Sequence, residues 1–123
     1  MPINYRIDGE RSRIVTTCSG DVTLPEVMAH FDQLQKDPAV TPRLNVLLDL
    51  TQQASVPVAR QIQAAADRVG LVNNIVFEAC AIVASREALY GMARMFEVLA
   101  RGHFSVLRTF RDRTEAEEWL DSF

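Results

Sequence analysis

Hydroxyl and guanidinium side chains follow three apolar stretches of the sequence, which end at Leu50, Ala84 and Phe110. These polar residues are Thr51, Ser55, Ser85, Arg86, Arg111 and Arg113. If the stretches are parallel strands, the residues after them lie along one edge of a sheet, where ligands bind and helix N-termini attract anions. The pattern predicts an anion-binding rim with Thr51 and Ser55 as candidate phosphoacceptors. The alternative, which we favour, is that Ser55, Ser85 and Thr114 are ordinary helix caps contributing roughly 1 kcal/mol each.

The sequence lacks the residue sets of standard catalytic and metal sites. His30 and His103 are the only histidines, and neither has the spacing of a zinc or cysteine–histidine site. We expect both on the surface, His30 on the polar side of its helix. Cys18 and Cys80 stand alone in strand-like stretches and are expected to be packed thiols rather than nucleophiles. We therefore predict no enzymatic activity, no metal and no cofactor.

Composition limits the class of protein and of partner. The chain has 123 residues, of which 48% are hydrophobic and 24% charged, which is typical of one folded domain over residues 1–123. A net charge of −3 provides no basic field for a phosphate backbone, so we predict no nucleic-acid partner. No apolar stretch reaches the roughly 18 residues of a membrane span, and no signal-peptide pattern opens the chain. The expected location is the cytoplasm.

Hydrophobic spacing predicts the first elements of the chain. Residues 3–8 and 14–19 are β-prone and are separated by a polar turn at 9–13, which is typical of a hairpin. Thr23 is placed to cap a helix whose apolar residues recur at spacings of three and four and which ends before Pro38. The chain is therefore expected to open with two antiparallel strands and a helix.

The three apolar stretches are residues 44–50, 75–84 and 105–110, and each leads into a predicted helix. Ser55 is expected to cap a helix ending at Gly70, and Ser85 a helix ending at Arg101. A capping box over 114–117 is expected to open the last helix. Strands joined through helices form parallel pairs. We predict an α/β fold: a mixed, mostly parallel five-stranded sheet with an N-terminal antiparallel hairpin and four helices, in the order β-β-α-β-α-β-α-β-α.

The helix predicted over 85–101 is more apolar than one buried stripe requires. The residues left over after that stripe are Tyr90, Met95, Val98 and Leu99. A wide apolar surface predicts self-association as a homodimer, an apolar ligand beneath the helix, or deeper burial, and the three alternatives remain open.

This order of elements resembles the SpoIIAA-like group of the STAS superfamily, the sulfate-transporter and anti-sigma-antagonist domains of bacteria. The motifs that carry the resemblance are Val46–Leu50 before a polar loop, and Val106–Asp112 followed by Glu115–Leu120. In anti-sigma antagonists a phosphorylatable serine follows the central strand in an Asp-Ser-Ser-Gly signature. Residues 51–57 lack this signature, and Thr51 and Ser55 are the nearest positional matches.

The resemblance implies a bacterial, non-enzymatic regulatory or protein-interaction module. Such a module would bind a protein partner as anti-sigma factor antagonists do, although this chain lacks their phosphoserine signature. The alternative is a carrier of a small apolar or lipid-like ligand, which the related lipid-binding CRAL-TRIO domains suggest.

Overall fold

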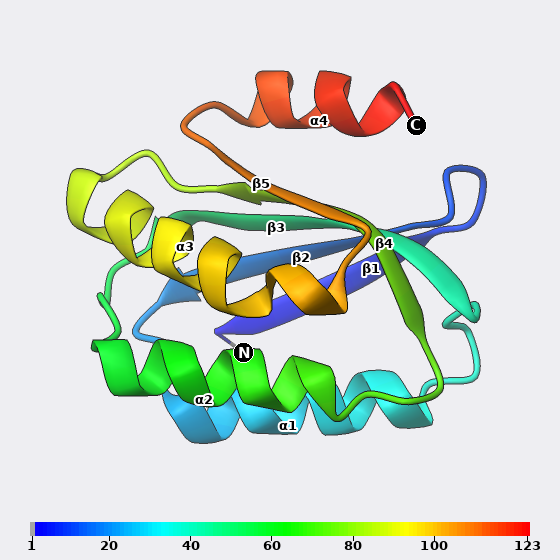
Figure 1. Cartoon of the computed structure of the whole chain (residues 1–123), viewed down its shortest axis with the longest axis horizontal. Helices are drawn as coiled ribbons and strands as arrows, with labels where there is room; N and C mark the ends of the chain where they lie inside the picture. Colours follow the sequence, from blue (N-terminus) through cyan, green and yellow to red (C-terminus); the bar gives the residue numbers. More distant parts are fainter. Residues whose placement is uncertain (1) are drawn as a thin grey trace.

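The computed structural model describes residues 2–123, which form a five-stranded sheet with helices on both faces (Figure 1). The strands are β1 (Ile3–Asp8), β2 (Arg13–Gly20), β3 (Arg43–Gln53), β4 (Val76–Val83) and β5 (Val106–Phe110). The helices are α1 (Leu24–Lys36), α2 (Ala59–Gly70), α3 (Glu87–Ala100) and α4 (Arg113–Asp121), and a short 3-10 turn, η1 (Arg101–His103), follows α3. Strand order follows chain order; β1 is antiparallel to β2 and the other neighbours are parallel. The predicted fold is confirmed.

The handedness of the crossovers decides which helix covers which face of the sheet. Strands β2 to β5 advance across the sheet in one direction, and each of α1, α2 and α3 connects two neighbouring parallel strands. Because such connections are right-handed, these three helices lie on the same face. The helix α4 follows the last strand, β5, and does not connect two strands. It packs on the opposite face of the sheet, where Figure 1 shows it apart from the other three helices.

Alternate residues of the central strand β3 face different layers. Leu47 packs beneath α4 together with Ala81 and Ala116, and all three are at most 1% exposed. The two alanines bring the backbone of α4 close to the sheet. Val46 and Leu48 point the other way, toward the helices α1 to α3.

Thr23 caps α1 as predicted. Its side chain accepts a hydrogen bond from the Glu26 N–H, and the Glu26 carboxylate accepts one from the Thr23 N–H, which completes a capping box. Pro25 in the first turn supplies a backbone angle that suits a helix start.

The predicted cap at Ser55 is wrong because β3 is longer than expected. The strand continues past Leu50 and stays paired with β2 as far as Gln53, so α2 begins only at Ala59. The Ser55 hydroxyl instead accepts a hydrogen bond from the Val22 N–H at 2.9 Å. Ser55 therefore ties the loop after β3 to the loop after β2.

The predicted caps at Ser85 and Thr114 are also displaced. Arg86 occupies the N-cap position of α3 and no side chain there accepts a helix N–H. At α4 the cap is Asp112, whose carboxylate accepts a hydrogen bond from the Thr114 N–H. An acidic cap two residues earlier makes Thr114 a residue of the first turn.

The cap assignments predict different losses of stability for two single substitutions. Thr23→Ala removes a capping box and should lower the free energy of unfolding by about 1 kcal/mol. Ser85→Ala removes no cap and should change it by less than about 0.5 kcal/mol. Urea unfolding monitored at Trp119 measures both, with the exposed Ala88→Ser as the control. Equal losses for Thr23→Ala and Ser85→Ala would contradict the assignment.

Candidate ligand-binding cavity

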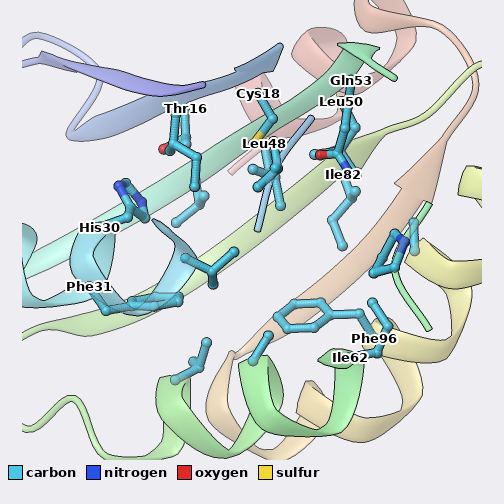
Figure 2. A pocket seen from close by; sticks show the side chains of 18 of the residues that line it. Thr16, Cys18, His30, Phe31, Leu48, Leu50, Gln53, Ile62, Ile82 and Phe96 are labelled. Atoms are coloured by element: carbon cyan, nitrogen blue, oxygen red, sulfur yellow. The ribbon is translucent and has the colours of Figure 1, made fainter. Parts of the chain in front are cut away.

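An apolar cavity of about 180 Å³ lies between the sheet and the helices α1, α2 and α3 (Figure 2). The sheet contributes Ile14, Thr16, Cys18, Val46, Leu48, Leu50, Cys80 and Ile82. The helices contribute Val27, His30, Phe31 and Leu34 from α1, Ile62, Ala65 and Val69 from α2, and Leu89, Met92, Ala93 and Phe96 from α3. Most of these side chains are aliphatic or aromatic, so the walls suit an apolar molecule.

The cavity leaves the central strand β3 incompletely buried on one face. A strand between two helical layers is normally buried on both faces. Leu47, which faces α4, is fully buried, whereas its neighbours Val46, Leu48 and Leu50 are only half-buried. Ala65 on α2 also lines this space, and its short side chain fills little of it. The space that remains is the cavity.

Two polar side chains face this apolar space from opposite walls. Figure 2 shows Thr16 pointing down from β2 and the His30 ring pointing up from α1 at the same end of the cavity. Tyr5 is paired with Thr16 across the hairpin, and its ring lies 5.6 Å from the His30 ring, centroid to centroid. Within residues 2–123, neither the Thr16 hydroxyl nor the His30 ring nitrogens make a hydrogen bond. Thr23, Gln53 and Gln61 also line the cavity, and each makes a side-chain hydrogen bond to another residue, whereas Thr16 and His30 make none among the described residues.

The prediction that His30 lies on the polar side of its helix is wrong. Val27, His30, Phe31 and Leu34 form one stripe at spacings of three and four, and this stripe faces the cavity. The same spacing in the sequence could have placed His30 inside. His103 is exposed as predicted, on η1, and its ring lies against the backbone of Gly70.

The cavity walls carry no ionised side chain at neutral pH. None of the residues that line it is aspartate, glutamate, lysine or arginine. Burial lowers the pKa of His30 to about 4, so its imidazole is neutral, and burial raises the pKa of the Cys18 thiol to about 12. Cys80 is also buried, which confirms the prediction of two packed thiols.

The residues predicted to form an anion-binding rim are engaged with groups of the chain itself. Arg86 donates hydrogen bonds to the carbonyl oxygens of Gln53 and Ala54 at 3.0 and 2.9 Å. Arg113 forms ion pairs with Asp49, which also accepts the Thr51 hydroxyl, and with Glu117. These contacts use the guanidinium groups that an anion would need.

Arg111 directly follows β5, at the end of the sheet where the chain leaves β4 for α3 and β5 for α4. It pairs with Glu87 at 2.8 Å, and its guanidinium lies 3.9 Å from the centroid of the Tyr90 ring. The hydrogen bond from Arg111 lowers the pKa of the Glu87 carboxyl. Ser85 is exposed. The anion rim and the phosphoacceptor role of Thr51 or Ser55 stay predictions.

The four surplus residues of α3 lie outside the cavity. Tyr90 and Met95 are half-buried, whereas Val98 is 60% and Leu99 37% exposed. The cavity is lined instead by residues on the neighbouring stripe of the same helix, such as Met92 and Phe96. None of the helices in the described part of the chain is long and apolar enough to cross a membrane.

A second hollow, of about 200 Å³, lies on the α4 face of the sheet. Its charged residues are Arg6, Asp8, Arg11, Arg13, Glu117 and Asp121. Arg13 was expected in the polar turn, but it is the first residue of β2, is 6% exposed, and pairs with Asp121 at 2.8 Å. Its Nε atom is buried without a hydrogen-bond partner among residues 2–123. Because three arginines and three carboxylates line the hollow, its net charge is close to zero.

The environment of His30 predicts how stability depends on pH. The lowered pKa means that the unfolded chain binds a proton at His30 between about pH 4 and 6.5 while the folded chain does not. Acidification through this range should lower the free energy of unfolding by on the order of 2–3 kcal/mol. His30→Phe should remove this part of the dependence, measured by urea unfolding across the range.

His103→Gln, which removes the exposed histidine, is the control for this measurement. The groups around His30 are Tyr5, whose hydroxyl donates to Asp37, and Cys18 across the cavity. Tyr5 and Cys18 stay protonated in this range because both have a pKa raised to about 12. A wild-type pH profile that His30→Phe leaves unchanged would contradict the burial of a neutral imidazole.

Comparisons with known proteins agree with the observed fold. The SpoIIAA-like family model matches residues 13–121. The fold is similar to that of an uncharacterised protein of the DUF3478 family with a SpoIIAA-like fold from Shewanella loihica PV-4, with a TM-score of 0.61 and 18% sequence identity over 96% of this chain and 91% of that one. No curated protein matches the chain. A match over nearly the whole sequence, on a sheet and helices of the expected order, shows that this chain belongs to the SpoIIAA-like family.

Proposed function

We propose that this chain is a non-enzymatic binding module that holds a small apolar or lipid-like molecule between its sheet and the helices α1 to α3. The observation that carries the proposal is the half-burial of Val46, Leu48 and Leu50 around a cavity of about 180 Å³. Native cores contain few voids larger than a water molecule. An engineered apolar cavity of about 150 Å³ in another protein stays dry and binds benzene, so this volume suits one ring or a short chain.

The chemistry of the titratable groups favours binding over catalysis. Thiolates are the nucleophilic form of cysteine, and the Cys18 thiol, with its pKa raised to about 12, is protonated at neutral pH. The neutral His30 ring packs against Tyr5 and Phe31 rather than against a carboxylate that would orient it as a base. Membership of the SpoIIAA-like family is also consistent with a binding or regulatory module.

Filling the cavity provides the test of this function. Ala65→Leu places a larger apolar side chain in the space and should abolish binding of toluene while leaving the fold intact. Toluene at 100 times its dissociation constant should raise the stability of the wild type by about 2.7 kcal/mol, measured by thermal unfolding. Ala59→Leu, on the exposed start of the same helix, is the matched control and should bind like the wild type.

Native mass spectrometry of freshly isolated wild type and Ala65→Leu should find a small apolar molecule with the former and not with the latter. A bare mass for the wild type, together with no thermal effect of toluene on it, would refute the proposal.

A protein partner is the second function we propose, as expected of a regulatory module. The exposed pair Val98 and Leu99 on α3 favours it, because neighbouring apolar side chains on a surface often mark an interaction site. The double substitution Val98→Asp with Leu99→Asp should abolish self-association measured by sedimentation, or the capture of a partner from the native cell. Arg94→Asp on the same exposed side of α3 is the control. A wild type that is monomeric and captures no partner would remove this function.

A further inference from the structure

We propose that the natural ligand of the cavity is an uncharged molecule with a small apolar body and one hydroxyl group, and that the hydroxyl lies between Thr16 and His30. This inference rests on the proposed function and names the class of molecule that the cavity takes. It makes Thr16 and His30 the residues that determine specificity.

The Thr16 hydroxyl belongs to a buried residue, faces the cavity and lacks a partner among the described residues. Thr16 is 3% exposed and lines the cavity, and its hydroxyl makes no hydrogen bond within the part of the chain that the structure describes. Buried polar groups in proteins nearly always have a partner, because leaving one unsatisfied costs free energy. A ligand group that hydrogen-bonds to Thr16 removes this cost. The ligand is therefore expected to carry a polar atom that reaches the Thr16 hydroxyl.

His30 supplies a complementary group on the opposite wall. A neutral imidazole has one nitrogen that donates a hydrogen bond and one that accepts. Tyr5 is held by its own hydrogen bond to Asp37, so it orients the His30 ring without competing for the ligand. A ligand hydroxyl can donate to one of Thr16 and His30 and accept from the other. A carbonyl oxygen has no proton to donate, so it can pair only with the donor of each group, whereas a hydroxyl can pair with either the donor or the acceptor of each.

The absence of ionised residues among those lining the cavity selects against charged ligands. A carboxylate transferred from water into this space would meet apolar side chains and neutral polar groups, with no lysine or arginine on the walls. Arg68 lies over the ring of Phe31, which lines the cavity, but its guanidinium is already paired with Asp32. Ionised carboxylic acids should therefore be excluded, whereas alcohols of the same size should be accepted.

Three probes of nearly the same shape test this inference: toluene, benzyl alcohol and benzoate. Isothermal titration calorimetry of the wild type at pH 7.5 should give a dissociation constant for benzyl alcohol that is 3- to 10-fold lower than that for toluene. Benzoate should show no binding. Thr16→Val keeps the shape of the side chain and removes the hydroxyl, and His30→Phe keeps a ring and removes both nitrogens.

Both variants should lose the preference for benzyl alcohol, measured within each variant as the ratio of the dissociation constants for toluene and benzyl alcohol. Thr17→Val, one residue further along β2 and outside the cavity lining, is the matched control and should keep the preference. Circular dichroism checks that each variant is folded.

The outcomes separate this inference from the proposed function. If toluene binds but benzyl alcohol binds no better, or if Thr16→Val keeps the preference, the inference is wrong and apolar binding stands. Tight binding of benzoate would also overturn it. If none of the three probes binds to the folded wild type, both the inference and the proposed function fail.

Discussion

Close packing of α4 against the central strands is the constraint on which the rest of the structure depends. Ala79, Ala81 and Ala116 bring helix and sheet close together, and Leu47 and Leu120 pack with them in one buried cluster. The charged hollow on this face lies beside that cluster, toward β1. A single helix thereby seals the middle of one face of the sheet. Since apolar burial is the main stabilising contribution to folding, a tightly packed face allows the other face to be packed less tightly.

The loosely packed face has a definite cost. At about 24 cal/mol for each Å³ of cavity, a space of about 180 Å³ corresponds to a loss on the order of 4 kcal/mol relative to a filled core. Domains are stable by only about 5–15 kcal/mol, so a loss of this size is a large fraction of the total. A molecule that fills the space restores part of the lost contact. Stability and occupancy of the cavity are thus linked in this fold.

The sequence predicted the fold because the signals for it are local. The apolar stretches that became β3, β4 and β5 and the capping residue Thr23 each act through near neighbours, and right-handed crossovers then leave few ways to arrange the strands. The cap predicted at Ser55 failed because pairing with β2 extends β3 to Gln53 and delays α2. At Ser85 the prediction was one residue too early, because Arg86 is the N-cap of α3. Strand pairing of this kind is not visible in local spacing.

The sequence predicts which residues of the candidate site face inward, but not that they enclose a cavity. A sequence gives the residues that face inward, but a cavity is the difference between the volume enclosed by several elements and the volume of their side chains. The position of His30 opposite Thr16 follows from how three helices dock on one sheet. The surplus of apolar residues on α3 left three alternatives open, one of them an apolar ligand beneath this helix. Those residues lie outside the cavity, which the neighbouring stripe lines.

The linear order of strands places the first and last strands of the chain at the two open edges of the sheet. β1 carries the exposed Arg6, and β5 has five residues with Arg108 at its centre. Short edge strands with charged side chains resist the addition of a further strand. Two copies of this chain are therefore poorly suited to join their sheets edge to edge, which protects the protein against fibrous aggregation and leaves helical surfaces as the route to assembly.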